Sequence, residues 1–373
     1  MQHKIYDLII IGAGAAGMFT AISAPKNMTK LLLEKNNKIG VKVLMSWGER
    51  CNVSNIDIEA ERDYFWLNTK SLYAVFKKFS NYDMMSWLEE RGVTTQIEDR
   101  WRIILASGKA TELVAKLHEE LIKNNTEIRL NTWVEEIEIQ EDTSFKITSW
   151  EHSFFAKHVV ISSGGKSFAS VGTDGWGYRM AQKFWHTLNE PFKGLCGMVS
   201  RENLAEVSGS TVFLDIQLFD DETLIYSEND GSFLFTHFGV SGPMMYNAVV
   251  KLGEHLRKNW ISPEQEAHYM RDHISLKLRF SEHSLTKKLE KFFNLSPEHM
   301  EIRLHINDLR SWSEAKVTWG WVKLDELTKN FESKFIPHLY MIGEVIDITG
   351  KTWGFNLQSA WSQWYIVGKS FET

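Results

Sequence analysis

Ile9-Ile10-Ile11-Gly12-Ala13-Gly14-Ala15-Ala16-Gly17-Met18 joins a short apolar run to an apolar helical stretch through a glycine-rich turn. A second apolar run, residues 30–33, ends in Glu34. Strand, glycine turn, helix, strand and acid in this order are typical of a dinucleotide-binding βαβ unit. The stretch therefore predicts a nucleotide site near the start of the chain. The alternative is an ordinary tight turn that binds nothing.

Each glycine of this stretch has its own expected role. Gly12 permits the tight turn, Gly14 lets a pyrophosphate approach the backbone, and Gly17 lets the helix pack on the strand. The phosphates would lie at the positive end of the helix, and Glu34 would accept a hydrogen bond from a ribose hydroxyl. The candidate cofactor residues of this unit are Gly12, Gly14, Ala15, Ala16, Gly17, Glu34 and Lys35.

Further motifs follow along the whole chain. They comprise residues 39–55, Gly108-Lys109-Ala110, residues 159–165 with Gly172-Thr173-Asp174-Gly175, residues 235–243, residues 339–347 and Gly354-Phe355-Asn356-Leu357-Gln358. In this order they resemble the motifs of the BaiN-like NAD(P)/FAD-dependent oxidoreductases, also labelled the aminoacetone oxidase family. The resemblance implies a cytoplasmic FAD-dependent oxidoreductase that transfers hydride or electrons between an organic substrate and the flavin.

The resemblance also implies an α/β fold. Its core would be a Rossmann-like FAD-binding domain of the two-dinucleotide-binding-fold flavoprotein type, with an inserted β-barrel-like plus helical domain. Residues 1–190 would form the first part of the FAD-binding domain, residues 191–314 the insertion and residues 315–373 the return segment. Within the insertion, residues 192–235 alternate like antiparallel strands, whereas residues 249–300 are charged and mostly helical in pattern.

The remaining candidate cofactor residues follow from the same resemblance. They are Lys42, Ser46, Arg50, Cys51, Asn52, Val134, Gly164, Gly165, Gly343, Glu344, Asp347, Gly354, Phe355, Asn356 and Leu357. Val134 would pass the adenine or simply pack, and Asp347 would meet ribityl or phosphate-side hydroxyls or be a solvated loop carboxylate. A helix that begins near Gly354 would place its positive end against the N1 and O2 edge of the flavin and stabilise the anionic reduced form.

No catalytic acid or base can be assigned from the sequence. His237 is a candidate because histidine titrates near neutrality, and a structural turn histidine is the alternative. NAD(P)H is a candidate reductant, but no second glycine-rich unit follows, so its hydride would be delivered from a shared or transient site. The chemistry itself would belong to the cofactor.

Tryptophan occupies positions where the family motifs carry glycine. These positions are Trp47, Trp101, Trp321, Trp353 and Trp364, and Trp185 is a sixth candidate. The chain has 15 tryptophans among 373 residues, and tryptophan neither reaches positive φ freely nor lets a backbone approach a ligand closely. We hypothesise that UGA codons are read as glycine in the source organism. The alternative is a diverged, non-catalytic descendant that has lost FAD through filled turns.

Composition narrows the partners. A net charge of −6 and a pI near 6.1 give no reason to expect a nucleic-acid surface, so a flavoenzyme that modifies RNA is the less favoured alternative to one with a small-molecule substrate. No apolar run has the length of a membrane span. The oligomeric state is open.

The rarer side chains add little. Cys51 and Cys196, the two cysteines, form no C-x-x-C pair and favour a reducing cytoplasm. A packing role for Cys51 is favoured over one beside the flavin. No metal site is expected, because His268 and His273 lack helical zinc spacing and fit a solvated helix face.

The periodicity predicts a helix over residues 72–91 that ends at Gly92, a helix over 111–123 and a terminal helix from Gly354 to residue 367. Strands are expected over residues 127–140, 144–155, 158–163 and 339–342.

Overall fold

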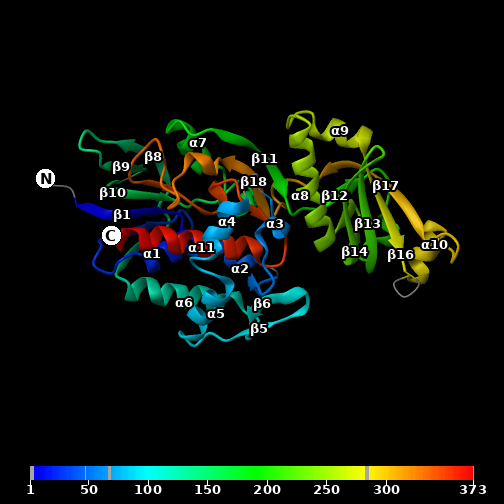
Figure 1. Ribbon diagram of the computed structural model, residues 1–373, viewed down its shortest axis with the longest axis horizontal. Helices are drawn as coiled ribbons and strands as arrows, with labels where there is room; N and C mark the ends of the chain where they lie inside the picture. The colour runs from blue at the N-terminus through cyan, green and yellow to red at the C-terminus, as the bar shows by residue number, and fades with distance from the viewer. Residues whose placement is uncertain (1–3, 47, 66–68, 151, 282–284, 373) are drawn as a thin grey trace. The chain divides into compact units, whose positions relative to one another are not determined.

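The computed structural model describes residues 4–46, 48–65, 69–150, 152–281 and 285–372, and it divides into two compact units (Figure 1). Unit 1 comprises Met1–Asn189 and Gly320–Thr373, and unit 2 comprises Glu190–Trp319. The chain returns to unit 1 at Gly320, five residues later than the position 315 expected from the sequence. It leaves unit 1 in β11 (Leu188–Gly194) and returns in β18 (Val317–Val322), and these two strands pair.

The core of unit 1 is a seven-stranded sheet. Its strands run in the order β7 (Thr126–Arg129), β2 (Lys30–Leu33), β1 (Ile5–Ile11), β10 (Ser153–Ile161), β9 (Phe145–Ser149) and β8 (Val134–Ile139), and β19 (Leu339–Met341) also pairs with β10. The neighbours β7, β2, β1, β10 and β19 are parallel, whereas β10, β9 and β8 are antiparallel. β2, β19 and residues 8–11 of β1 are buried along their whole length because both faces of the sheet are covered there, whereas β7 at the edge is polar and partly exposed.

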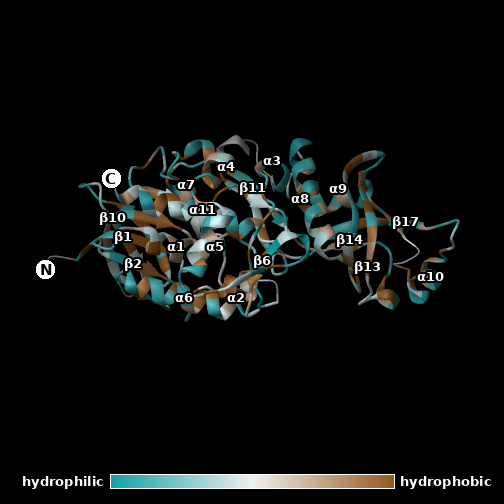
Figure 2. Cartoon of the chain, turned by 60° about the horizontal axis from the view of Figure 1, so that its bottom comes forward, coloured by the Kyte–Doolittle hydropathy of each residue, from teal (hydrophilic) through white to brown (hydrophobic). Residues whose placement is uncertain are grey.

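Helices cover this sheet. α1 (Ala15–Ser23) packs against α11 (Phe355–Lys369) and α6 (Ala110–Lys123), and Figure 1 shows α11, in red, beside α1. Phe19 of α1 meets Trp361 of α11 with ring centroids 5.5 Å apart. Figure 2 shows the hydrophobic colour concentrated on β1, β2 and β10, under the helices. The carboxyl ends of β1, β2 and β10 thereby lie at one edge of a rigid core.

Smaller elements complete unit 1. They are α2 (Val41–Met45), β3 (Asn52–Asn55), α3 (Ala60–Asp63), β4 (Tyr64–Phe65), α4 (Thr69–Phe76), α5 (Asn81–Glu89), β5 (Thr95–Ile97), β6 (Arg102–Leu105), α7 (Trp176–Lys183) and β20 (Thr349–Gly350). β3, β6 and β5 form a small sheet, and β20 pairs with β4.

Unit 2 is a closed barrel with helices. The strands run in the order β12 (Met198–Ser200), β15 (Gly239–Ser241), β14 (Thr223–Thr236), β13 (Thr211–Asp220), β16 (Ile274–Phe280) and β17 (Glu301–Leu309). Along β13 every second residue is buried, from Val212 to Leu218, as a strand with one face in a core requires. The helices are α8 (Pro243–Lys258), α9 (Glu266–His273) and α10 (Lys287–Phe293).

Three expectations from the sequence were wrong in detail. The helix expected over residues 72–91 is two helices, because the Ser80 side chain accepts from the Asp83 amide and starts α5 anew with a capping box. The strands expected over residues 127–140 and 144–155 divide into β7, β8, β9 and the start of β10. The region 249–300 contains β16 between its helices, since that strand closes the barrel.

Among the described residues, no helix combines the length and the apolar character needed to span a bilayer.

Candidate cofactor site

The glycine turn between β1 and α1 has the geometry expected from the sequence. Gly12 adopts φ +105°, and a Cβ on it would lie 2.6 Å from the Ser162 carbonyl oxygen. A Cβ on Gly17 would lie 2.0 Å from the Gly12 oxygen. Only glycine fits at either position. Gly14 caps α1 with φ −72°, and a Cβ there would have no heavy atom of the described chain within 4 Å.

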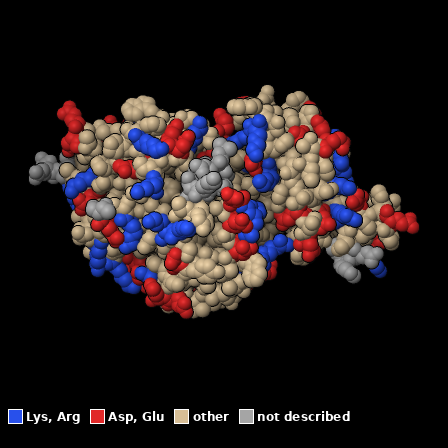
Figure 3. Space-filling model, in the orientation of Figure 1, with Lys and Arg blue, Asp and Glu red and all other residues tan. Residues whose placement is uncertain are grey.

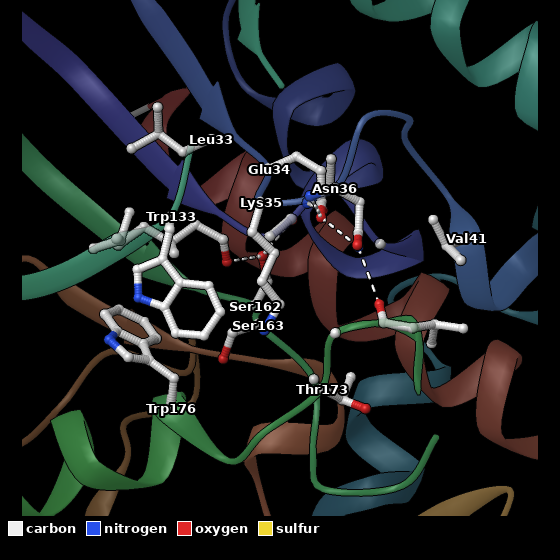
Figure 4. Close-up of a pocket in the computed structure, with 18 of the residues that line it drawn as sticks. Leu33, Glu34, Lys35, Asn36, Val41, Trp133, Ser162, Ser163, Thr173 and Trp176 are labelled. Carbon is white, nitrogen blue, oxygen red and sulfur yellow. Dashed lines mark hydrogen bonds between the residues drawn. The ribbon is translucent and has the colours of Figure 1, made fainter. Parts of the chain in front are cut away.

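Glu34 fixes this turn from the end of β2. The carboxylate is 7% exposed. One oxygen accepts from the Ala13 amide at 2.8 Å, and the other accepts from the backbone and side-chain nitrogens of Asn36 at 2.9 and 2.8 Å. The Asn36 side chain also donates to the Val171 carbonyl at 3.1 Å (Figure 4). Each carboxylate oxygen has two acceptor sites, so Glu34 keeps capacity for a ribose hydroxyl.

A cleft opens beside the turn. Its lining combines the glycine turn, the end of β2 and three further segments, namely residues 132–134, 162–164 and 171–174 with Trp176. Trp133 and Trp176 both line it (Figure 4). The Lys35 ammonium stands 4.5 Å from the Trp133 ring centroid and 3.4 Å from an Asp174 oxygen. Val134, Gly164, Lys35 and Lys42 all line this cleft, whereas Gly165 does not.

A polar cluster closes the cleft near α2. Lys42 Nζ donates to a Glu344 oxygen at 2.6 Å and to Ser167 Oγ at 2.9 Å, and Ser167 Oγ donates to the other Glu344 oxygen at 2.5 Å. Glu344 lies in the turn after β19, and Gly343 in that turn adopts φ +71° and donates its amide to Gln363 of α11 at 2.9 Å. The cluster joins residues predicted separately from two distant motifs.

The second motif forms a turn around a buried thiol. Cys51 is fully buried with φ +61°, and its amide donates to the Ser46 carbonyl at 3.2 Å. Arg50 pairs with Glu98 at 2.5 Å. Asn52, 8% exposed, begins β3. Of the motif residues 42–52 predicted to bind the cofactor, only Lys42 lines the cleft.

The closing motif starts α11 as expected. Gly354 caps the helix with φ +95°, and a Cβ on it would lie 2.3 Å from the Ser54 oxygen. The Asn356 side chain exchanges hydrogen bonds with the backbone of Gly350 at 2.8 and 2.9 Å. The Phe355 carbonyl accepts from the Tyr64 hydroxyl at 2.7 Å, and Leu357 is partly buried. These contacts fix the helix start but place none of these side chains in the cleft.

Asp347 is not the solvated carboxylate that was one of the two sequence expectations. It is 3% exposed, so it is not a solvated loop carboxylate. One oxygen accepts from the Gly320 amide at 3.0 Å and the other from the Asn189 side chain at 2.5 Å. The carboxylate therefore anchors the segment where the chain returns to unit 1, and it does not line the cleft.

The cleft fits the phosphate and ribose half of a dinucleotide. The space over Gly14 accepts a group that a Cβ would block, and the turn leads into the N-terminus of α1, where anions are favoured. Ser163 lines the cleft, and its buried hydroxyl has no hydrogen-bond partner among the described residues. A buried polar group without a partner is costly, and a bound polar ligand would satisfy it.

Some lining residues were missed by the sequence analysis. They are Asn36, Thr132, Trp133, Ser163, Ser167 of the adjoining cluster, and Trp176. Ser163, Thr173 and Asp174 lie in quoted motifs but were not assigned to the site. The sequence signal that could have found Asn36 and Trp133 is their place in the chain, because they are direct neighbours of predicted site residues.

Histidines lie elsewhere. His237 is exposed in the turn between β14 and β15, in keeping with a turn histidine. His268 is exposed and pairs with Asp272 at 3.6 Å, whereas His273 is half-buried and pairs with Asp221 at 3.1 Å. Asp220 lies beside this pair and contacts His255 Nε2 at 2.6 Å, so contacts between side chains account for this group.

Both thiols are expected to be inert in the folded protein. Burial raises the pKa of Cys51 to about 11 and the pKa of Cys196 to about 12, so at pH 8 each is almost entirely the unreactive thiol. We expect no labelling by a maleimide at pH 8 without denaturant, and labelling of both thiols after unfolding, read by mass spectrometry. Rapid native labelling of Cys51 would contradict its burial.

The order of motifs around this cleft identifies the family. Residues 6–370 match the model of the HI0933-like protein Rossmann domain. The chain belongs to this family. The resemblance inferred from the sequence is thus confirmed, and so is the Rossmann-like fold.

Similar proteins cover almost the whole chain. A ribosomal RNA dihydrouridine synthase of Escherichia coli strain K12 is 28% identical over 96% of both chains. A 3-dehydro-bile acid delta(4,6)-reductase of Clostridium scindens is 25% identical over 97% of this chain and 98% of the relative. The solved 3-ketosteroid-delta4-(5alpha)-dehydrogenase of Rhodococcus jostii RHA1 shares the fold with a TM-score of 0.56 at 14% identity, over 100% and 98% of the two chains.

This HI0933-like chain is therefore an FAD-dependent oxidoreductase. No comparison supports the alternative of a non-catalytic descendant.

Proposed function

We propose that this enzyme reduces a carbon–carbon double bond conjugated to a carbonyl group. The names of the two relatives share this chemistry, because a dihydrouridine is a uracil saturated next to a carbonyl and a delta(4,6)-reductase acts on double bonds conjugated to an oxo group. The observation that carries the proposal is the combination of a cleft at Gly12–Glu34 that fits the phosphate and ribose half of a dinucleotide with two such relatives over almost the whole chain.

The chain's own residues would hold and orient the cofactor. The backbone at Gly14 and the start of α1 would bind the pyrophosphate, and Glu34 would accept from the ribose. Lys42 would lie beside the phosphates, held by Glu344 and Ser167. The first amides of α11 have no partners within the helix, and they would stabilise negative charge on the flavin ring. Reduced FAD, when bound, supplies a hydride to the carbon β to the carbonyl, while the α carbon takes a proton.

The reductant is proposed to be NADH or NADPH. Net reduction of a double bond needs an external hydride donor, because FAD returns to its oxidised form after each turnover. With a single glycine-rich unit in the sequence, the nicotinamide would visit the flavin transiently. We place this reaction in a reducing cytoplasm, in keeping with two buried, unpaired cysteines.

A small neutral organic molecule is the substrate favoured by charge. The net charge is −6, and on the face drawn in Figure 3 basic and acidic side chains are interspersed. A nucleic-acid surface would be enriched in basic residues. Uridine in ribosomal RNA is the second candidate, and the 28% identity to the dihydrouridine synthase favours it.

Anaerobic turnover tests the proposal and separates the two substrates. The flavin-loaded enzyme is bleached with NADPH or NADH, then mixed with a 3-oxo-4-ene steroid or with ribosomal RNA transcribed without modification. We expect the oxidised flavin absorbance to return with one substrate, together with a product heavier by a pair of hydrogens. Return with the steroid alone supports a small-molecule enzyme, and return with RNA alone supports the second candidate. A flavin that stays reduced with both would contradict the proposal.

A further inference from the structure

Tryptophan is concentrated at backbone positions that suit glycine. Among the described residues, 18 other than glycine have positive φ, and five of them are tryptophans, although tryptophan makes up only 15 of the 373 residues. The five, with φ values of 61°, 64°, 60°, 102° and 85°, are Trp101, Trp185, Trp260, Trp321 and Trp353. Composition does not explain this concentration.

Positive φ is unfavourable for a bulky L-residue. The Cβ clashes with the backbone there, so single residues in this region are mostly glycine, with asparagine and aspartate next. Asn125, Asn131 and Asp221 are examples of the tolerated kind. Trp321 at 102° and Trp353 at 85° lie beyond the left-handed helical region, whose φ is about 50–70°. Only glycine adopts that backbone without strain.

The Trp321 side chain is crowded as well as strained. Its ring centroid lies 3.0 Å from that of Tyr178, with the planes 9° apart, whereas non-bonded carbons prefer a separation of about 3.5–4.0 Å. Its indole nitrogen is buried with no hydrogen-bond partner among the described residues. With glycine at position 321, the Tyr178 ring could stay in its place without this close contact.

Trp353 lies next to a backbone contact that matters for the site. Gly354 packs against Ser54 so closely that no Cβ fits, and the Trp353 carbonyl accepts from the Asn55 side chain at 3.1 Å. The backbone here is fixed by the β3 strand, while the indole turns away to the Arg102 guanidinium, 4.8 Å from its ring centroid. The backbone contacts hold this peptide, whereas the indole packs at the edge of the hydrophobic core beside Arg102.

Two other tryptophans, Trp361 and Trp176, show none of these features. Trp361 lies inside α11, is 0% exposed, and donates its indole N–H to the Val53 carbonyl at 2.8 Å. Trp176 is 6% exposed and donates to the Glu135 carbonyl at 3.0 Å. Neither has positive φ. A buried indole with a partner for its N–H is the ordinary role of tryptophan.

We infer that glycine occupies positions 101, 185, 260, 321 and 353 in the protein that the source cell makes, because the codons there are read as glycine. The backbone thus adds position 260 to those suspected from the motifs and supports 185. Trp47 lies outside the described residues. Trp364 is helical, so φ does not decide its identity, although its buried indole nitrogen has no partner among the described residues.

Codons and peptides test the inference directly. We expect UGA at the five positions and UGG at Trp361 and Trp176, and mass spectrometry of the protein from its source cells should read glycine at the five positions and tryptophan at the other two. Tryptophan in the peptides that contain positions 321 and 353 would overturn the inference.

Recombinant chains give a second test that needs no source cells. We compare the melting temperatures, without added flavin, of the chain as written, a variant with Trp→Gly at all five positions, and a control with Trp361→Gly. The five-fold variant should melt about 5–10 °C higher, because backbone strain is relieved. The control should melt roughly 5 °C lower, because it leaves a cavity.

A five-fold variant that melts lower than the chain as written would also overturn the inference. This readout does not depend on the proposed reaction. A wrong substrate class would leave the melting temperatures unchanged. A wrong inference about glycine would leave the result of the reductase assay to be judged on its own.

Discussion

A Gly14→Ala variant should fold like the parent chain and yet lose most of its affinity for FAD. Gly14 has an ordinary φ of −72°, and the added methyl would meet no heavy atom of the described chain within 4 Å. The methyl would instead occupy the space where the pyrophosphate approaches the backbone. We expect FAD to bind at least about 100-fold more weakly, a loss of about 2.7 kcal/mol.

Gly12→Ala is the matched comparison. Gly12 has φ +105°, and its Cβ would lie 2.6 Å from the Ser162 oxygen, so this variant should lose both stability and flavin. Melting temperature without flavin and quenching of FAD fluorescence on binding separate the two effects. If Gly14→Ala bound FAD like the parent, the pyrophosphate would not lie at this turn.

Glu34→Gln should weaken FAD binding by about 10–100-fold, since hydrogen bonds to a charged group contribute roughly 1.5–3 kcal/mol. Both carboxylate oxygens are acceptors, one from the Ala13 amide and one from Asn36. An amide side chain keeps one acceptor but turns its NH₂ toward another donor. The turn would shift, and a ribose hydroxyl would lose its charged partner.

Glu138→Gln is the control for this change, because Glu138 on β8 accepts from Lys146 at 2.9 Å and does not line the cleft. Its FAD affinity should equal that of the parent. Titration of each purified chain with FAD gives the dissociation constants. Equal constants for Glu34→Gln and Glu138→Gln would remove Glu34 from the cofactor site.

Local patterns predicted the parts of this protein whose geometry is set locally. The turn at Gly12 and the acid at Glu34 were predictable because each depends on a few neighbouring residues. The start of α11 at Gly354 followed from its motif. The break between α4 and α5 at Ser80 was missed because helical spacing of apolar residues continues through it. Ser80 and Asp83 have the spacing of a capping box and could have indicated the break.

Contacts between distant segments were not predictable in the same way. β16 was hidden in a charged, helix-like region because its strand identity comes from its partners β13 and β17 in the barrel. The motif around Asp347 gave its position in the sequence. Its burial depends on the hydrogen bonds from Gly320 and Asn189, which form only where the chain re-enters unit 1. The cluster of Lys42 with Ser167 likewise joins segments that no local pattern connects.

The contact between Lys42 and Glu344 spans 302 positions of the chain, and it has a consequence for protein synthesis. The glycine turn leaves the ribosome long before Glu344 and α11 do. Domains generally fold as units during synthesis, so the whole of unit 2 is available to fold before the cleft can close. A chain that terminates early, including one made in a host that treats UGA as a stop, would carry the turn without its closing half. Flavin uptake would then report that translation has passed α11.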